Sequence, residues 1–183
     1  MQDTQSNKFV LTEGNYYLKT STEESSLDGD VKIKYPIQIN GNVTICLNGK
    51  TIESSAKDQP VVEVTSGSTL TLTDCKGNAG KVKHTSDGSG SGVKVENGGT
   101  FNMYGGTITG NKATTGDTAT QRGGGVYVDG TGSTFTMNGG TITDNTATKG
   151  GGGVYVSGGT FTIKGNATVT SNKATDQNNN IAG

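Results

Sequence analysis

Three stretches of the chain repeat one apolar pattern, and this repetition constrains the fold more than any other feature. Each copy reads Gly-Val-x-Val, continues to a Phe and ends in Thr-Ile-Thr or Thr-Val-Thr before an Asn; the copies start at Gly92, Gly125 and Gly153. The pattern recurs every 26 to 34 residues. Such a period is typical of a solenoid, in which one unit buries its apolar face only against its neighbours.

Each unit consists of short segments in which apolar and polar residues alternate, the pattern of strands with one buried side. Weaker copies start near Phe9, Ile37 and Val62. We therefore predict an all-β fold, a right-handed single-stranded parallel β-helix of about six coils with three short strands each, since parallel crossovers are right-handed. Residues 1–35 are predicted to form an N-terminal cap and a first irregular coil. Residues 36–183 form the repeats, interpreted as a truncated part of a longer protein.

Alignment of the copies predicts which side chains lie over one another. The expected inward columns are Val93, Val126 and Val154; Phe101, Phe135 and Phe161; and Ile108, Ile142 and Val169. Asn111, Asn145 and Asn172 are expected at one corner, with left-handed backbone and with amides hydrogen-bonded between coils. The same alignment places Ile45 beside Leu70, and Cys46 beside Thr71.

Composition and charge exclude several classes of function. The net charge of -1 gives no field for nucleic acid, and no apolar run is long enough for membrane insertion. Val, Ile, Leu and Phe make up only 33 of the 183 residues, but their regular placement indicates a folded chain. The 31 glycines fit many tight turns between strands.

Cys46 and Cys75 have no metal-ligand spacing, and the single histidine, His84, cannot complete a zinc site with them. We therefore expect neither a metal nor another cofactor. The predicted register places Cys75 past the end of its strand, four residues beyond the neighbour of Cys46. This register argues against a disulfide, which stays an alternative for an exported chain.

The outward side chains of the first strand in successive coils form the candidate binding surface. They are Gln38, Glu63, Lys94, Tyr127 and Tyr155. Exposed tyrosines in adjacent coils would offer a platform for sugar rings, so Tyr127, Tyr155, Lys94 and Glu63 are the candidate ligand-binding residues. The alternative is that the two tyrosines only stabilise the sheet as a cross-strand pair.

Regular threonines occupy the third strand of three coils: Thr107 and Thr109, Thr141 and Thr143, Thr168 and Thr170. These rows resemble the ice-binding face of β-helical antifreeze proteins. Ice binding is therefore a minor alternative function. The preference of threonine for strands explains the same rows without a ligand.

The acidic residues do not form a catalytic pair. Asp117, Asp129, Asp144 and Asp176 fall singly at corners, whereas hydrolysis of a glycosidic bond needs two carboxylates that face each other. His84 has no evident partner, and the single arginine, Arg122, lies in the longest loop. The glycine runs at 123–125 and 150–153 lack the following helix of a phosphate-binding loop. We predict no catalytic residues and a protein that is not an enzyme.

Several sequence motifs resemble those of a known family. Gly-Gly-Gly-Val-Tyr-Val at 123–128 and 151–156, Gly-Thr-Phe-Thr at 159–162 and Asn-Gly-Gly-Thr-Ile-Thr at 138–143 resemble the β-helical repeat regions of bacterial adhesin-like surface proteins. Phe135-Thr136-Met137-Asn138 resembles the Phe-x-x-Asn motif of the polymorphic outer membrane protein family. The resemblance implies a secreted or cell-surface bacterial protein that acts as a stalk or binding module.

The partner implied by this resemblance is a glycan or a host surface protein, and further domains of the same chain are expected. The competing hypothesis is a β-helix portion of a polysaccharide-degrading enzyme whose catalytic residues lie elsewhere.

Overall fold

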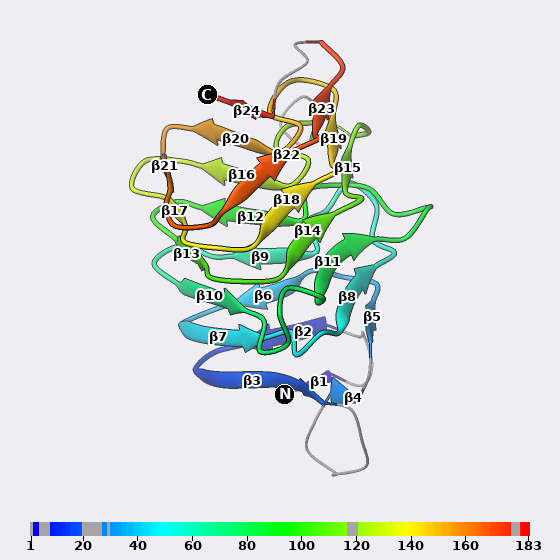
Figure 1. The fold of residues 1–183 in the computed structure, drawn as a ribbon, viewed down its shortest axis with the longest axis vertical. Helices are drawn as coiled ribbons and strands as arrows, with labels where there is room; N and C mark the ends of the chain where they lie inside the picture. Colours follow the sequence, from blue (N-terminus) through cyan, green and yellow to red (C-terminus); the bar gives the residue numbers. More distant parts are fainter. Residues whose placement is uncertain (1, 4–7, 20–26, 29, 117–120, 177–179) are drawn as a thin grey trace.

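The computed structural model describes residues 2–3, 8–19, 27–28, 30–116, 121–176 and 180–183. Within these ranges the chain forms strands and turns but no helix. Successive coils stack along the long axis, with the N-terminus at one end and the C-terminus at the other (Figure 1). The predicted right-handed parallel β-helix of about six coils is confirmed.

Four sheets follow the long axis (Figure 1). The eight-stranded sheet contains β1 (Gln2–Asp3), β2 (Lys8–Leu11), β6 (Ile37–Ile39), β9 (Val62–Val64), β12 (Val93–Glu96), β16 (Val126–Asp129), β20 (Val154–Ser157) and β24 (Ile181–Ala182). The seven-stranded sheet contains β4 (Leu27–Asp28), β3 (Gly14–Lys19), β7 (Asn42–Cys46), β10 (Thr69–Thr73), β13 (Thr100–Met103), β17 (Thr134–Met137) and β21 (Thr160–Ile163). The six-stranded sheet contains β5 (Val31–Ile33), β8 (Thr51–Ser54), β11 (Lys81–His84), β14 (Thr107–Thr109), β18 (Thr141–Thr143) and β22 (Thr168–Thr170).

The fourth sheet is a feature that sequence reasoning missed. It consists of β15 (Lys112–Ala113), β19 (Thr146–Ala147) and β23 (Lys173–Ala174), so three coils have a fourth, two-residue strand. Each strand directly follows a ladder asparagine and buries one alanine. Two residues are too few to show a period of two, which is why the expected three strands per coil were incomplete.

The inward columns have the predicted register. Val93 pairs with Val126 and Val126 with Val154, and the isoleucine and phenylalanine columns pair in the same way. The rings of Phe101 and Phe135 stack with centroids 4.7 Å apart, and those of Phe135 and Phe161 stack at 4.8 Å. These spacings match the distance between neighbouring strands, so the core is a set of side-chain stacks parallel to the axis.

The asparagine corner forms a hydrogen-bonded ladder. Oδ1 of Asn145 accepts from the backbone N of Asn111 at 3.0 Å and from its Nδ2 at 2.9 Å, and Oδ1 of Asn172 accepts likewise from Asn145. The expected left-handed backbone at these residues is wrong. The left-handed backbone conformation occurs one residue before each asparagine, at Gly110 (φ 66°), Asp144 (φ 56°) and Ser171 (φ 55°). The preceding residue makes the turn and the asparagine amide closes it.

The predicted register of one coil is wrong by two residues. In β7, Val43 pairs with Leu70 and Ile45 pairs with Leu72. Cys46 therefore has Thr73 rather than Thr71 as its neighbour. The corner between β6 and β7 is two residues shorter than the next one, between β9 and β10. Alternating apolar residues fit either register, because a shift of two keeps the same side chains inward.

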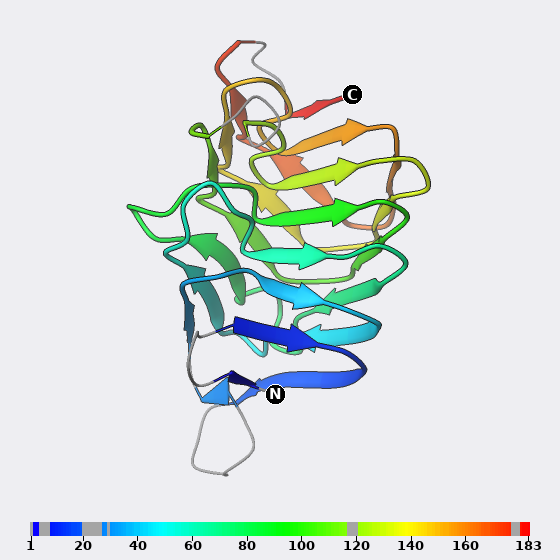
Figure 2. The same ribbon diagram turned by 180° about the vertical axis from the view of Figure 1, so that it is seen from behind.

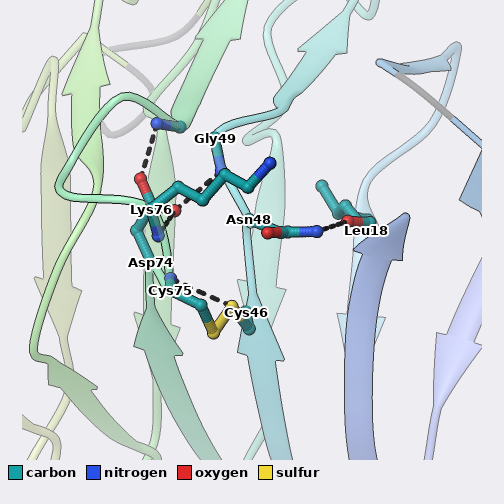
Figure 3. The surroundings of a disulfide bond; sticks show 8 residues. Leu18, Cys46, Asn48, Gly49, Asp74, Cys75 and Lys76 are labelled. Atoms are coloured by element: carbon teal, nitrogen blue, oxygen red, sulfur yellow. Dashed lines mark hydrogen bonds between the residues drawn. A yellow bond between two sulfur atoms is a disulfide. The ribbon is translucent and has the colours of Figure 1, made fainter. Parts of the chain in front are cut away.

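This shift permits a disulfide between Cys46 and Cys75, whose Cα atoms are 6.2 Å apart, so the expectation against a bridge is wrong (Figure 3). Cys75 lies only two residues past the partner of Cys46, in a turn that folds back over β7. The carboxylate of Asp74 holds this turn: Oδ1 accepts from the N–H of Gly49 and Oδ2 from that of Gly80, each at 2.7 Å. The solvent-facing side of Cys46 is thereby covered.

The first coil is regular in its strands. Phe9 pairs with Ile37, as the weaker copies predicted, and Tyr16 pairs with Ile45 and Val31 with Ile52. Strand β1 pairs with β2 antiparallel, the single antiparallel pairing in the described part of the chain. The expected cap and the boundary at residue 35 stay predictions, since residues 4–7, 20–26 and 29 lie outside the described residues.

Candidate functional site

A groove crosses the outer face of the eight-stranded sheet, the face turned toward the viewer in Figure 2. Its volume is about 430 Å³, within the range of small-molecule and carbohydrate-sized sites. The lining residues are Tyr35, Pro36, Gln38, Asp58, Gln59, Pro60, Glu63, Gly90, Ser91, Lys94, Tyr127 and Asp129. We refer to this site as the groove.

The floor of the groove is the row of outward side chains that the repeat alignment predicted. Gln38 pairs with Glu63, Glu63 with Lys94 and Lys94 with Tyr127, on β6, β9, β12 and β16. The parallel pairing places one floor residue from each coil beside the next. Nε2 of Gln38 donates to Oε2 of Glu63 at 3.1 Å, which fixes one end of the row.

The wall of the groove consists of the corners that precede these strands. Both prolines of the chain, Pro36 and Pro60, lie in this wall and limit its backbone freedom. The N–H of Gln59 donates to the carbonyl of Ser89 at 3.2 Å, and Oγ of Ser89 donates to Oδ1 of Asp58 at 3.0 Å. The wall is therefore hydrogen-bonded from coil to coil before any ligand arrives.

Lys94 lies at the centre of the floor. It forms an ion pair with Glu96, two residues along the same strand and therefore on the same side. Burial alone would lower the pKa of Lys94, but the hydrogen bond to Glu96 and the negative charges of Glu96, Glu63 and Asp129 raise the pKa above its usual value. The lysine is held as an ammonium among carboxylates.

Tyr127 is 4% exposed, so the structure buries a ring that was expected to be exposed. Its hydroxyl lies among the side chains of Asp129, Ser157 and Arg122. Burial, followed by the charge and hydrogen bond of Asp129, raises the pKa of Tyr127. The ring supports the end of the floor and is almost wholly withdrawn from solvent.

Tyr155 lies outside the groove, contrary to the idea of two stacked tyrosines as a platform. Its ring packs edge-on against Tyr127, with centroids 5.7 Å apart and an interplanar angle of 63°. The guanidinium carbon of Arg122 lies 5.0 Å from the Tyr155 ring centroid. This cation–π contact places Arg122 over the Tyr155 ring and beside Tyr127.

Tyr35 is the exposed aromatic residue of the groove, and sequence reasoning missed it. Its side chain is 41% exposed at the corner between β5 and β6. Corner residues lie outside the alternating pattern, so the repeat alignment did not assign Tyr35 a direction. The usable signal was its position beside Pro36, because both prolines precede strands of one sheet.

The remaining candidates are dispersed. Asp129 lines the groove, and in the sheet it pairs with Glu96 of β12 and Ser157 of β20. Asp144 occupies a left-handed corner, Asp176 an exposed turn, and Asp117 lies outside the described residues.

His84 is 2% exposed and contacts Asn111 and Gln59, so the expectation that it lacks a partner is wrong. In the described ranges, no three His, Cys, Asp or Glu side chains gather as a metal site.

The fold and the groove define a class: a parallel β-helix with a preformed groove of mixed polar and apolar lining on one sheet. Compared with family models, curated proteins and solved structures, the chain gives no match. The described part of the chain also contains no helix of the length and apolarity that a membrane span needs.

Proposed function

We propose that this protein is a non-catalytic, exported β-helix that binds glycans in the groove. One observation carries the proposal: a groove of about 430 Å³ combines Tyr35 and two prolines with Gln38, Lys94 and carboxylates. Sugars present C–H faces, which pack on aromatic and proline rings, and hydroxyls, which bond to amide and charged groups. A wall that is hydrogen-bonded from coil to coil lowers the ordering cost of binding.

Export is supported by the disulfide between Cys46 and Cys75, because structural disulfides persist in oxidising compartments. A cell-surface location would suit an adhesin-like stalk that presents the groove to a glycan-coated partner. The bacterial origin and the further domains implied by the family resemblance belong to the same proposal.

A glycan array with the wild-type protein and two substituted variants tests this function. We expect Tyr35→Ala and Gln38→Ala to lose binding at least tenfold, because each removes a groove contact. The control is Tyr104→Ala, which removes a 57% exposed tyrosine after β13, outside the groove. Equal loss in the control, or no glycan bound by the wild type, would refute the proposal.

A polysaccharide-degrading enzyme is the second candidate. The presence of Glu63 and Asp129 in one groove favours it, because glycoside hydrolysis uses two carboxylates. Incubation of the protein with the glycan that it binds, followed by chromatography, distinguishes the two functions. Shortened products that disappear with Glu63→Gln would support the enzyme, and an unchanged glycan would support the binding module.

A further inference from the structure

The charges of the groove are unequal. Three carboxylates line it, Asp58, Glu63 and Asp129, against one ammonium, Lys94. The ion pair with Glu96 already neutralises that ammonium. Arg122, the single arginine, does not line the groove and lies over the Tyr155 ring. The described lining therefore has a net negative charge.

The pKa of Lys94 reflects the electrostatic potential at the centre of the groove. A half-buried lysine normally loses a proton more easily, because burial disfavours the ammonium. Here Glu96, Glu63 and Asp129 outweigh that effect and raise the pKa of Lys94. The floor therefore stabilises positive charge despite its partial burial. A second cation in the groove would experience the same carboxylates.

The carboxylates retain acceptor capacity for a ligand. Glu63 accepts one hydrogen bond, from Gln38 through Oε2, whereas a carboxylate has about four lone-pair sites. Asp129 lies beside the hydroxyl of Tyr127, on the strand that follows Lys94 in the sheet. An ammonium group has three donors and matches such acceptors, whereas a ligand carboxylate or sulfate would face like charges.

We propose that the groove selects glycans with free amino groups, that is hexosamine units, over neutral glycans, and excludes acidic ones. This selectivity rests on the proposed glycan binding. Glu63 and Asp129 receive the ammonium from either side of Lys94, and Tyr35 with the two prolines packs on the sugar ring.

Three oligosaccharides of equal length test the selectivity: a glucosamine oligomer, its fully N-acetylated counterpart and a galacturonate oligomer. Calorimetry at a mildly acidic pH keeps the amine charged. We expect the glucosamine oligomer to bind at least tenfold more tightly than the acetylated one, with an advantage that shrinks as salt is added. The galacturonate oligomer should not bind.

Variants assign the effect to the groove. Glu63→Gln and Asp129→Asn keep the shape of each side chain, and each should reduce affinity for the glucosamine oligomer about tenfold without changing the acetylated one. The control is Glu53→Gln, which removes a carboxylate paired with Lys83 on the six-stranded sheet. It should leave both affinities unchanged.

The outcomes separate the two proposals. Equal binding of the amino and acetylated oligomers, or the same loss in Glu53→Gln, overturns the selectivity and leaves glycan binding intact. Tighter binding of the galacturonate oligomer also overturns it. Absence of binding to all three oligomers and to the glycan array overturns the proposed function and the selectivity together.

Discussion

The imidazole of His84 closes one end of the asparagine ladder, with Nδ1 2.9 Å from Oδ1 of Asn111. The amide nitrogen of Asn111 donates to two backbone carbonyls and to Oδ1 of Asn145, so its own oxygen faces the ring. A neutral imidazole carries one N–H, so it donates either to this oxygen or, through Nε2, to a second acceptor, and only the imidazolium donates to both. Its Nε2 lies 3.1 Å from the carbonyl oxygen of Gln59, in the groove wall.

This contact predicts a pH dependence of stability. Burial lowers the pKa of His84 below its ordinary value of 6.5, and the contacts with Asn111 and Gln59 raise it less. The unfolded chain therefore takes up the proton at higher pH than the folded chain. Stability is present above pH 6.5 and is lost as the pH falls from there through the lower folded pKa.

The measurement is urea unfolding at several pH values between about 5.5 and 7.5, where His84, the single histidine, is the side chain that titrates from its ordinary value. His84→Gln should flatten the dependence. An equal slope in the variant would show that His84 does not cause it.

The phenylalanine column predicts an order of destabilisation. Phe135 is fully buried and stacks on two rings, whereas Phe161 is half-buried and stacks on one. Phe135→Ala should cost about 3 to 5 kcal/mol in the free energy of unfolding, and Phe161→Ala about half as much. Chemical denaturation checks the order, and an equal or reversed cost would contradict the stacked core.

Removal of the middle rung of the ladder should be costly. Asn145→Ala leaves the N–H of Asn111 and two carbonyl oxygens without their partner, with an expected loss of about 3 kcal/mol. Asn102→Ala, on the outer side of β13, is the matched control and should change stability by less than about 0.5 kcal/mol. Similar values for the two variants would remove the structural role of the ladder.

The disulfide closes a loop with a sequence separation of 29. The double variant Cys46→Ala, Cys75→Ala should lose about 3.5 kcal/mol, because the unfolded chain regains the entropy of this loop. A reductant should lower the denaturation midpoint of the wild type to about that of the double variant. It should leave the double variant unaffected, and a drop there would mean that the reductant acts elsewhere.

One corner residue offers a stabilising change. Ser171 has φ 55°, while Gly110 has the equivalent conformation (φ 66°) two coils earlier. Ser171→Gly should raise the free energy of unfolding by about 0.5 to 1 kcal/mol, since left-handed backbone strains a residue with a Cβ. Gly110→Ala is the reciprocal test and should lower the free energy of unfolding. A loss with Ser171→Gly would contradict the assigned strain.

The repeat pattern was sufficient to predict the fold and the floor of the groove, because both follow from alternation and from equivalence between coils. Val93 above Val62, and Lys94 beside Glu63, are consequences of one register. The pattern failed where alternation is ambiguous. A two-residue shift at β7 keeps Val43 and Ile45 inward, so the pattern alone could not reveal that Cys75 returns to Cys46.

The wall of the groove could not be predicted, because corners have no period. The direction of Tyr35 and the approach of Gln59 to His84 depend on how each corner folds back. The burial of Tyr127 depends on Arg122, a residue of the longest loop, which packs over the tyrosine pair. Such contacts join segments that have no counterpart in the other coils.

The floor of the groove receives one outward residue from each coil, at the spacing of about 4.8 Å between neighbouring strands. The core consists of the inward columns, which face away from this row. Exchange of a single floor residue thus alters the groove without disturbing the core. The row is a regular array of positions, and substitutions at these positions are expected to change the specificity for polymeric ligands.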